Sequence, residues 1–574
     1  MRVFVPISVG GWDRLFSRWD VFAVLLIIGL LVFLGEASRH LFQPLVDLQR
    51  SPPSLDPAYL PEYAARTTLR MLVAMALSLL FTFTYATLAA RNRNAERLLV
   101  PLLDILQSVP ILGFISVTVV FFMALAPGKV LGAEFAAIFA IFTSQAWNMA
   151  FSFYQSLRTV PTELVEASRN FRLSPWMSFW RIDVPFAMPQ LIWNMMMSMS
   201  GSWFFVVASE AISVGNTTVT LPGVGSYIAL AIQQQNLRAV GWAIFTMLIV
   251  ILIYDQILFR PLVAWADRFR FDQEPGILVP ESWMLNILRR SRIVDRLTHP
   301  FGALWRRTLI GHPSDSLATI RPASQPRRGW IIFQWGLVIA LTALALWESI
   351  SFLIEGITVS DVGTALLLGF YTLIRVVVLI GLASVIWVPI GVWVGTRPYA
   401  TQIVQPVAQF LAAFPANVVF PIVVSLIVAW KLNPNIWLSP LMILGTQWYI
   451  LFNVIAGASS IPNELRAVGA NFRVRGLLWW RRIALPAVLP FYVTGAITAS
   501  GGSWNASIVA EVASWGNEHL QAAGLGAYIA QQTDAGDFHR IVLGIVVMSF
   551  YVVLINRILW RPLYEYAERK FKLG

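Results

Sequence analysis

The sequence contains no cysteine, which excludes disulfide bonds and thiolate metal sites. Its five histidines are scattered along the chain and show no metal-ligand spacing. Only 13% of the 574 residues are charged, whereas soluble domains usually carry about 25%. Lysine occurs four times and never in a G-x-x-x-x-G-K-[ST] phosphate loop, so we do not expect this chain to hydrolyse ATP. Because no catalytic dyad or nucleophile motif stands out either, the sequence argues against an enzyme.

Apolar residues dominate the chain instead. They make up 57% of it, and the mean hydropathy of +0.67 indicates a polytopic membrane protein. The formal net charge of +12 could suggest a nucleic-acid partner, but the arginines lie in short loops that border apolar runs. We therefore expect no nucleic acid, and we assign these charges to membrane lipid and to anchoring on the cytoplasmic side.

Apolar runs of about 20 residues, long enough to cross a bilayer as helices, occur repeatedly. The predicted spans lie near 20–37, 67–90, 101–125, 131–156, 188–210, 240–262, 330–353, 366–394, 403–429, 437–460, 487–511 and 540–561. No A-x-A cleavage site follows the first run, so we expect it to stay as a span. Arginines cluster in the polar gaps on one side, and the positive-inside rule makes that side cytoplasmic, with both termini.

One polar stretch between two spans occurs twice, 301 positions apart (462 − 161). Residues 161–189 and 462–490 share ten identities, among them Asn-Phe-Arg at 170–172 and 471–473. Upstream the spacing becomes 305, as between Arg70 and Arg375. The sequence therefore predicts an all-α polytopic protein of about 12 transmembrane helices, built as two tandem six-helix units with pseudo-twofold symmetry.

The repeat also sets the expected domain boundaries. We place the first unit at 1–262, with a cytoplasmic loop at 157–187, and the second at 329–574, with its loop at 461–486. Between them, 263–328 is expected to be a basic cytoplasmic linker with an amphipathic run from Trp283 to Leu297. A regulatory domain is the alternative, although the segment has little apolar content for a core.

Each repeated stretch is expected to form a short helix that projects into the cytoplasm. Thr162 and Asn463 would serve as N-caps, each followed by an acid in the first turn. Prolines at 185, 189, 486 and 490 would then break the incoming helix and start the next span. Two such protrusions suit the docking of two copies of a partner, and a merely solvated loop is the alternative.

These stretches resemble the coupling loops of membrane subunits of ATP-binding-cassette importers. The resemblance rests on Glu166-Ala167-Ser168, on Ile182-Asp183-Val184-Pro185 and on Ile483-Ala484-Leu485-Pro486. It implies that each loop inserts a coupling helix into a separate ATPase subunit, which carries the ATP and magnesium. The residues expected at these contacts are Glu163, Glu166, Ala167, Ser168, Arg172, Glu464, Ala467, Gly469 and Arg473.

The chain departs from the family pattern in two places. Arg172 and Arg473 occupy the position of the family's glycine, and Ala467 stands where the second copy would have its glutamate. We therefore expect the two ATPase contacts to be unequal. Whether the two ATPases are identical or different stays open.

Polar residues inside spans are candidates for the translocation pathway. They occur in pairs, one from each unit, and comprise Arg70, Arg375, Trp147, Trp448, Ser202, Ser503, Trp203, Trp504, Glu210 and Glu511. The arginines could attract an anion, whereas the alternatives for the charged residues are snorkelling, a gate, or pairing with each other. For the residues near the serines, tight helix packing is an equal alternative.

The overall pattern is similar to fused permeases of the nitrate, sulfonate and taurine group. This resemblance implies a multi-pass protein of the bacterial cytoplasmic (inner) membrane that takes a small anion from an extracytoplasmic substrate-binding protein. Ferric iron and thiamine are alternative substrates of related permeases. An ion-gradient-driven secondary transporter, with Glu210 and Glu511 binding the coupling ion, is an alternative of another class.

Overall fold

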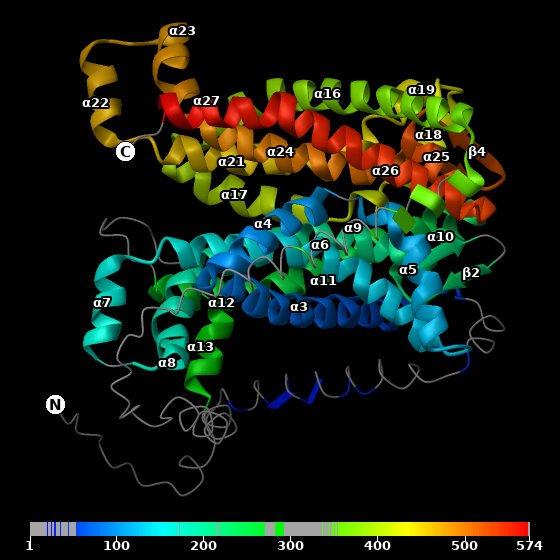
Figure 1. Cartoon of the computed structure of the whole chain (residues 1–574), viewed down its shortest axis with the longest axis horizontal. Coiled ribbons are helices and arrows are strands. Elements are labelled where there is room, and N and C mark those ends of the chain that lie inside the picture. The colour runs from blue at the N-terminus through cyan, green and yellow to red at the C-terminus, as the bar shows by residue number, and fades with distance from the viewer. Residues whose placement is uncertain are drawn as a thin grey trace, which may run out of the picture.

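The computed structural model describes residues 53–269, 282–291 and 354–571, except Val109, Arg172, Gly215 and Asn216, and scattered positions before 53 and between 336 and 352. Within these residues the chain forms two helical halves that lie side by side (Figure 1). The first half extends to α13 and the second begins with α16. The prediction of an all-α polytopic protein with an internal duplication is confirmed.

The first half consists of helices and one hairpin. Its elements are η1 (Pro57–Tyr59), α3 (Leu60–Arg91), α4 (Arg93–Ser108), α5 (Ile111–Leu125), α6 (Val130–Arg158), α7 (Thr162–Asn170), α8 (Pro175–Ser178), η2 (Phe179–Asp183), α9 (Val184–Ser209), β1 (Ala211–Val214), β2 (Thr217–Thr220), α10 (Val224–Gln233), α11 (Leu237–Tyr254), η3 (Asp255–Phe259), α12 (Arg260–Ala266), η4 (Asp267–Phe269) and α13 (Trp283–Arg290).

The second half repeats most of this order. Its elements are α16 (Val359–Gly395), α17 (Pro398–Ala413), η5 (Ala416–Val418), α18 (Phe420–Ala429), α19 (Pro434–Trp437), α20 (Leu441–Leu444), α21 (Gln447–Ser459), α22 (Asn463–Asn471), α23 (Gly476–Trp479), η6 (Trp480–Ala484), α24 (Leu485–Ala510), β3 (Val512–Trp515), β4 (Glu518–Gln521), α25 (Leu525–Ala535), α26 (Phe538–Ile555), η7 (Asn556–Trp560) and α27 (Arg561–Phe571).

Local features recur at the spacing of the sequence repeat. The π-helical segments η2 and η3 of the first half correspond to η6 and η7 of the second. The side chains of Asn236 and Asp537 cap α11 and α26 by accepting from the backbone three residues on. The duplication is therefore structural as well as sequential.

Seven described helices are long and apolar enough to cross a membrane, and nine result if each of two bent pairs counts as one span. The seven match the predicted spans near 67–90, 131–156, 188–210, 240–262, 366–394, 487–511 and 540–561. The predicted spans near 20–37 and 330–353 lie largely outside the described residues. The predicted count of 12 is therefore not confirmed.

Three predicted spans are interrupted, two of them next to a proline, which cannot donate a backbone hydrogen bond inside a helix. Near 101–125, α4 ends at Ser108 and α5 starts after Pro110. Near 403–429, the helices on either side of Pro415 meet at an angle of 68°, and near 437–460 a bend of 45° separates Pro434–Leu444 from Gln447–Ser459. The prediction of continuous helices was wrong at these places.

Two antiparallel hairpins were not predicted from the sequence. In one, β1 pairs with β2, and in the other β3 pairs with β4, with Trp515 opposite Glu518. Gly516 has a φ of +61°, which favours glycine and suits the two-residue turn between β3 and β4. Short strands between long apolar helices gave too weak a period-2 signal to be recognised.

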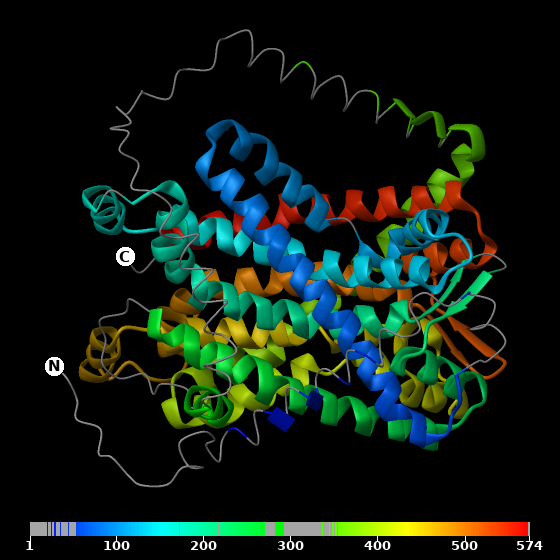
Figure 2. The ribbon, with the colours of Figure 1, turned by 90° about the horizontal axis from the view of Figure 1, so that it is seen from below.

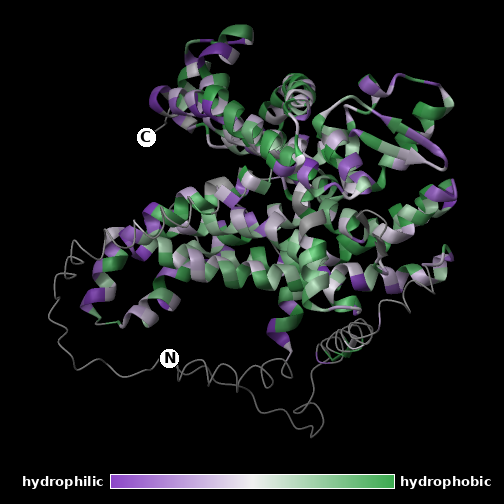
Figure 3. Cartoon of the chain, turned by 45° about the vertical axis from the view of Figure 1, so that its right-hand side comes forward, coloured by the Kyte–Doolittle hydropathy of each residue, from purple (hydrophilic) through white to green (hydrophobic). Residues whose placement is uncertain are grey.

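The two ends of the molecule differ in character. Helices α7 and α22 protrude together at what we call the loop end, and both hairpins lie at the opposite hairpin end (Figure 2). Hydrophobic residues cover the long helices between these ends, while hydrophilic residues gather on the protrusions (Figure 3). This distribution fits a bilayer around the middle of the molecule.

The predicted boundary at 262 falls inside α12. Of the segment 263–328, the structure describes the end of α12, η4 and α13. Helix α13 packs on the first half through buried Met284 and Ile287, and Trp283 Nε1 donates to Gln256 Oε1 at 3.3 Å. The predicted amphipathic run thus forms a helix as far as Arg290, and its remainder from 292 to 297 lies outside the described residues.

Candidate functional site

The loop end presents two equivalent short helices. Both α7 and α22 have nine residues and begin after a proline, Pro161 or Pro462, that occupies the N-cap position without a side-chain hydrogen bond. The prediction of Thr162 and Asn463 as N-caps was therefore wrong by one residue, because each is the first helical residue. The first-turn acids Glu163 and Glu464 are in place and exposed, where they complement the helix dipole.

The predicted contact residues divide into an exposed and a packed set. Glu166 and Ala467 are exposed at matching positions, so the charge difference between the two copies lies on the surface. Ser168 is buried, and its Oγ donates to Ser178 Oγ at 3.0 Å. At the matching Gly469, an added Cβ would lie 2.7 Å from Ile483 Cδ1. A residue larger than glycine would therefore displace the end of the Ile483 side chain, where the helix packs on the segment returning to the span.

The remaining loop residues lie at the tips. Ala167 is half-buried, and Arg473 is exposed with a left-handed φ of +50°. The predicted contact at Arg172 lies outside the described residues. Phe171 and Phe472 are 79% and 78% exposed, so each tip offers a bare aromatic ring to a partner. The sequence repeat contained this pair, but sequence reasoning gave it no role.

At the hairpin end, the predicted residues Arg70 and Glu210 form a buried ion pair. Arg70 Nη1 donates to Glu210 Oε1 at 2.6 Å, and the two side chains are 3% and 0% exposed. The other side of the guanidinium binds Glu134, with Nε and Nη2 each donating to one carboxylate oxygen at 2.6 Å. This fork-to-fork pair joins α3 to α6, while Glu210 joins both to the end of α9.

Glu210 also holds the helix that follows the hairpin. Its Oε2 accepts from the backbone N–H of Gly225 at 2.7 Å, in the first turn of α10. Thr67 Oγ1 donates to Glu210 at 2.6 Å and accepts from Val224 N at 3.1 Å. A Cβ at Gly223 would overlap the Glu210 carboxylate. The helix N-terminus and its glycines are thus fitted closely around this carboxylate.

The second half contains the same arrangement in a looser form. Arg375 Nη1 donates to Glu511 Oε1 at 3.0 Å, and its side chain is 13% exposed. Thr372 Oγ1 donates to Glu511 at 2.8 Å and accepts from Leu525 N at 2.9 Å, as Thr67 does in the first half. In place of Glu134, this cluster has the amide of Asn435, whose Oδ1 accepts from Arg375 Nη2 at 3.3 Å.

Sequence reasoning named the arginines and the two span-ending glutamates but missed their other partners. Glu134 lies within the predicted span near 131–156, and an ionisable residue inside a span is itself a signal that could have found it. Its counterpart Asn435 lies 301 positions later (435 − 134). Thr67 and Thr372 give no comparable signal, because hydroxyls are common inside transmembrane helices.

The predicted tryptophans and serines lie at helix contacts. Trp203 and Trp504 are each 1% exposed. Ser202 Oγ lies 2.7 Å from Ser144 Oγ of α6, and Ser503 Oγ lies 3.0 Å from Thr446 Oγ1. These positions agree with the packing alternative for small residues in membrane helices.

The predicted pair Trp147 and Trp448 has different surroundings in the two halves. Trp147 packs edge-on against Phe81 at 5.4 Å between ring centroids, within the first half. Trp448 lies 5.2 Å from Trp387 and packs on a cluster that also touches Met197 of the first half. Trp448 therefore packs on a cluster that reaches the first half, whereas the ring contacts of Trp147 are with Phe81 and Phe142 of its own half.

The two halves meet through pseudo-equivalent contacts in the middle of the molecule. The backbone N–H of Ile111, just after Pro110, donates to Asn505 Oδ1 of α24 at 2.6 Å. Asn417, just after Pro415, donates from Nδ2 to the carbonyl of Phe204 in α9 at 3.0 Å. The broken spans thus bring freed backbone and amide groups to the interface, where irregular backbone is tolerated in membrane proteins.

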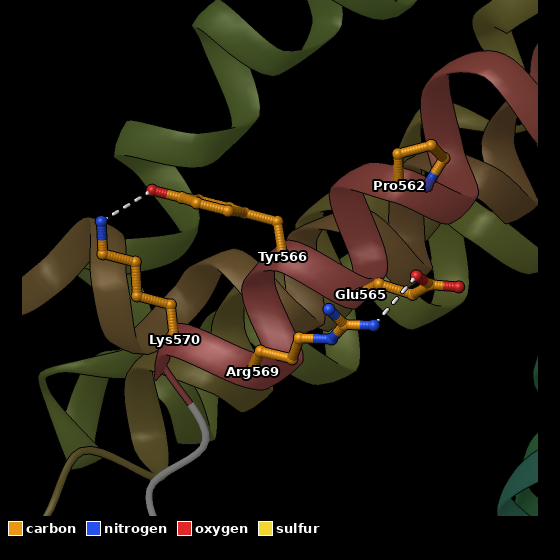
Figure 4. Close-up of a pocket in the computed structure, with 5 residues that line it drawn as sticks. All are labelled: Pro562, Glu565, Tyr566, Arg569 and Lys570. Atoms are coloured by element: carbon orange, nitrogen blue, oxygen red, sulfur yellow. Dashed lines mark hydrogen bonds and ion pairs between the residues drawn. The ribbon is translucent and has the colours of Figure 1, made fainter.

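A hollow of about 430 Å³ lies beside α27, lined by Pro562, Glu565, Tyr566, Arg569 and Lys570 (Figure 4). Lys570 Nζ donates to Tyr566 Oη at 3.1 Å, and Arg569 pairs with Glu565 at 3.6 Å. The charged side chains that line this hollow are thus largely paired with neighbouring side chains of the same helix. Among the described residues, no group of three or more His, Asp or Glu side chains could hold a metal ion. We assign no cofactor to this surface.

Comparisons with known proteins bear on both halves. Residues 82–264 and 387–571 each match the family described as binding-protein-dependent transport system inner membrane component. Relatives include the bicarbonate transport system permease protein CmpB of Synechococcus elongatus, 27% identical over 32% of this chain and 64% of the relative. The nitrate import permease protein NrtB of Leptolyngbya laminosa is 24% identical over 30% of this chain and 59% of the relative.

A third relative broadens the range of named substrates. The glycine betaine/proline betaine transport system permease protein ProW of Escherichia coli is 27% identical over 26% of this chain and 45% of its own length. The chain therefore spans less than two thirds of the length of each of these curated relatives. Because the two family matches together cover more than half of the chain and fall one in each half, this protein belongs to the inner membrane components of binding-protein-dependent transport systems, as a duplicated permease.

Proposed function

We propose that this chain is a membrane permease subunit of an ATP-driven importer for a small anion such as bicarbonate or nitrate. The observation that carries the proposal is the presence of two equivalent helices, α7 and α22, which protrude at one end of a duplicated permease. A chain without a phosphate loop must obtain the energy of ATP from partners, and two matching protrusions suit two ATPase subunits.

The loop end is then the cytoplasmic side of a bacterial inner membrane, with both termini, and the hairpin end faces a substrate-binding protein outside. Arginines support this orientation, because five of them lie near the loop end: Arg91, Arg158, Arg169, Arg473 and Arg475.

The protruding helices would enter the clefts of the ATPases. The exposed residues at this contact would be Glu163, Glu166, Glu464 and Ala467, with the rings of Phe171 and Phe472. Ser168 and Gly469 would hold each helix against its span.

One continuous helical element joins each loop to the hairpin end. In the first half it runs from Pro175 to Ser209, and in the second from Gly476 to Ala510, 35 residues each. At 1.5 Å per residue, each element is about 50 Å long. Glu210 and Glu511 directly follow these elements and hold the hairpin and the next helix. A tilt imposed by an ATPase at the loop would therefore reach the opposite side of the membrane.

The translocation pathway would run between the halves, where parallel repeats place it in other transporters. Both guanidiniums, of Arg70 and Arg375, are engaged by carboxylates in this structure. This favours helix pairing over anion binding for these two residues and for Glu210 and Glu511. Trp448, at the boundary between the halves, is the best placed of the remaining pathway candidates.

The names of the relatives support an anion. Bicarbonate and nitrate occur in the names of two relatives, and a betaine in the name of the third. A zwitterionic betaine is therefore the second candidate substrate. Ferric iron and thiamine remain alternatives from the sequence pattern alone.

Uptake by the reconstituted complex tests the proposal. Proteoliposomes containing the chain with its co-purified ATPases and binding protein should take up labelled bicarbonate or nitrate only when ATP is supplied on the loop side. Betaine, ferric iron and thiamine serve as competing substrates. Uptake that persists without ATP and stops when an ion gradient is collapsed would instead show a secondary transporter.

A further inference from the structure

The hairpin end contains a contact between the halves that the proposed function does not use. The backbone N–H of Gly516, in the turn of the β3–β4 hairpin, donates to the carbonyl of Ile232 in α10 at 3.0 Å. Gln235, just beyond α10, donates from Nε2 to the carbonyl of Trp515 at 3.3 Å. The turn of the second half therefore lies on the end of α10 of the first half.

Each partner in this contact is firmly attached to its own half. Helix α10 is held to α3 and α9 through Glu210 and Thr67, and the backbone N–H of Leu221 donates to the carbonyl of Glu210 at 2.8 Å. The β3–β4 hairpin is held to α24 in the same way, because Ala522 N donates to the carbonyl of Glu511 at 2.8 Å. We call the described residues of these two attached regions, 211–214 with 217–235 and 512–536, the hairpin units.

The forces within and between the hairpin units differ in kind. Each unit is attached through a buried, charge-assisted cluster, which is costly to break inside a membrane protein. The hydrogen bonds between the units come from the side chain of Gln235, an exposed residue, and from backbone groups of a half-buried turn. Such neutral hydrogen bonds contribute about 0.5–1.5 kcal/mol each to stability, less than charge-assisted ones. When the halves move, this contact should separate first, while each unit moves with its own helices.

The hairpin units also lie at the outer end of the interface between the halves, where a barrier to the substrate would have to be. They cover the interface between the halves at the hairpin end, with β3 against α10 and α25 against β1. Trp515 is 8% exposed and belongs to a core cluster that includes residues of both halves.

We propose that the contact of Trp515-Gly516 with Ile232 and Gln235 is the outer gate of the transporter. It closes the way between the halves in the state described, and it separates in each ATP-driven cycle to admit the substrate. This assignment rests on the proposed function, because it requires ATPases that move the halves.

The absence of cysteine allows a direct test with the double variant Gln235→Cys/Gly516→Cys. A Cβ at residue 516 would lie 2.6 Å from Cγ of Gln235, which is one bond from Cβ of that residue. The two Cβ atoms would therefore be at most about 4.1 Å apart, which is below the upper limit of about 4.5 Å for a disulfide. Gln235 already has a φ of +52°, so its backbone accepts a side chain in this conformation.

The experiment uses the complex of this chain with its ATPases in lipid nanodiscs. Mild oxidation of the resting complex should form the disulfide, seen as loss of both sites for maleimide-polyethylene glycol. When ATP and vanadate arrest the ATPases, the rate of disulfide formation should fall by about tenfold, as expected if the closed state becomes a minor population. The locked complex should lose ATP hydrolysis to about one tenth, and reductant should restore it.

A matched control pair lies in the same hairpin. Ser514 and His519 face each other across β3 and β4, so Ser514→Cys/His519→Cys should form a disulfide that leaves the gate free. This locked control should hydrolyse ATP at the rate of its reduced form.

Because Cys at the left-handed Gly516 could prevent folding, spin labels at exposed Gln234 and Glu518 provide a second measurement. Their distance should lengthen when ATP and vanadate are added.

Two results would overturn the gate. One is disulfide formation at the same rate with and without arrested ATPases, together with an unchanged spin-label distance. The other is full ATP hydrolysis by the locked complex. If no ATPase accompanies the folded chain, the proposed function fails first and the gate fails with it, so the two failures are distinguishable.

Discussion

Glu134 and Asn435 occupy equivalent positions in the two halves, and each accepts a hydrogen bond from the arginine of its own half. Glu134 binds Arg70 through both carboxylate oxygens at 2.6 Å. Asn435 binds Arg375 once, at 3.3 Å, and also accepts from the backbone N–H of Ala523 at 2.8 Å. The first cluster therefore contains one more carboxylate than the second, and the two clusters should respond differently to the same change.

Replacing the two arginines should show this difference between the clusters most clearly. Arg70→Met would leave two buried carboxylates without a cation, and breaking a buried ion pair costs about 3–5 kcal/mol. Arg375→Met would leave one carboxylate, in a cluster that is more exposed, and should cost less. Thermal unfolding of the purified chain, followed by tryptophan fluorescence, should show the larger fall in Tm for Arg70→Met. Equal falls would contradict the asymmetry.

Asn435 also indicates which substitution Glu134 tolerates. Glu134→Asn recreates the second cluster in the first half, so the guanidinium of Arg70 keeps an acceptor on α6. Glu134→Leu removes that acceptor and should destabilise the chain further, by about 1–3 kcal/mol relative to Glu134→Asn. Chemical or thermal unfolding of the two variants measures the difference. An equal stability of both would show that Glu134→Asn keeps no stabilising contact with the guanidinium of Arg70.

Glycines beside the glutamates should be sensitive to a single methyl group. A Cβ at Gly223 or Gly524 would overlap the carboxylate of Glu210 or Glu511. Gly223→Ala and Gly524→Ala should therefore displace the hairpin units and lower the yield of monodisperse protein on size exclusion. Gly241→Ala and Gly363→Ala are matched controls, since an added Cβ meets no atom within 4 Å at either position. A normal yield for Gly223→Ala would show that the fit around Glu210 is looser than described.

The loop end should be sensitive to charge reversal at one exposed residue. Glu166→Lys should reduce the amount of ATPase that co-purifies, because it replaces an acid on the exposed side of α7 by a cation. The fold should persist, since Glu166 has no buried contact. Glu518→Lys, a charge reversal at another exposed residue, lies at the hairpin end; it is the control and should leave ATPase association intact. Unchanged association in Glu166→Lys would count against docking at α7.

The sequence predicted the long helices, the duplication and the protruding helices, because each rests on a strong signal. Apolar runs above about 18 residues predict spans, and a repeat of constant spacing predicts equivalent positions. It also predicted pairing as one alternative for Arg70 with Glu210 and for Arg375 with Glu511. The breaks after Ser108 and Ala413 were missed, although each of the two apolar runs contains a proline, Pro110 or Pro415. Hydropathy alone does not show whether an apolar run forms one continuous helix.

Other features depend on contacts between segments far apart in the chain. Glu134 meets Arg70 across 64 positions, and Gln235 meets Trp515 across 280 positions. The roles of Gly223 and Gly225 appear only when Glu210 is placed beside them, 13 and 15 positions earlier in the chain (223 − 210 and 225 − 210). The hairpins were missed because four-residue strands have too little periodicity to compete with neighbouring spans.

The claim that each protruding helix docks one ATPase is central to this account, and native mass spectrometry of the complex tests it most directly. The chain has a mass of 64.2 kDa and should be released from nanodiscs with two ATPase subunits, identical or different. A preparation in which the folded chain carries one ATPase or none, at protein concentrations that preserve the binding-protein contact, would contradict the account.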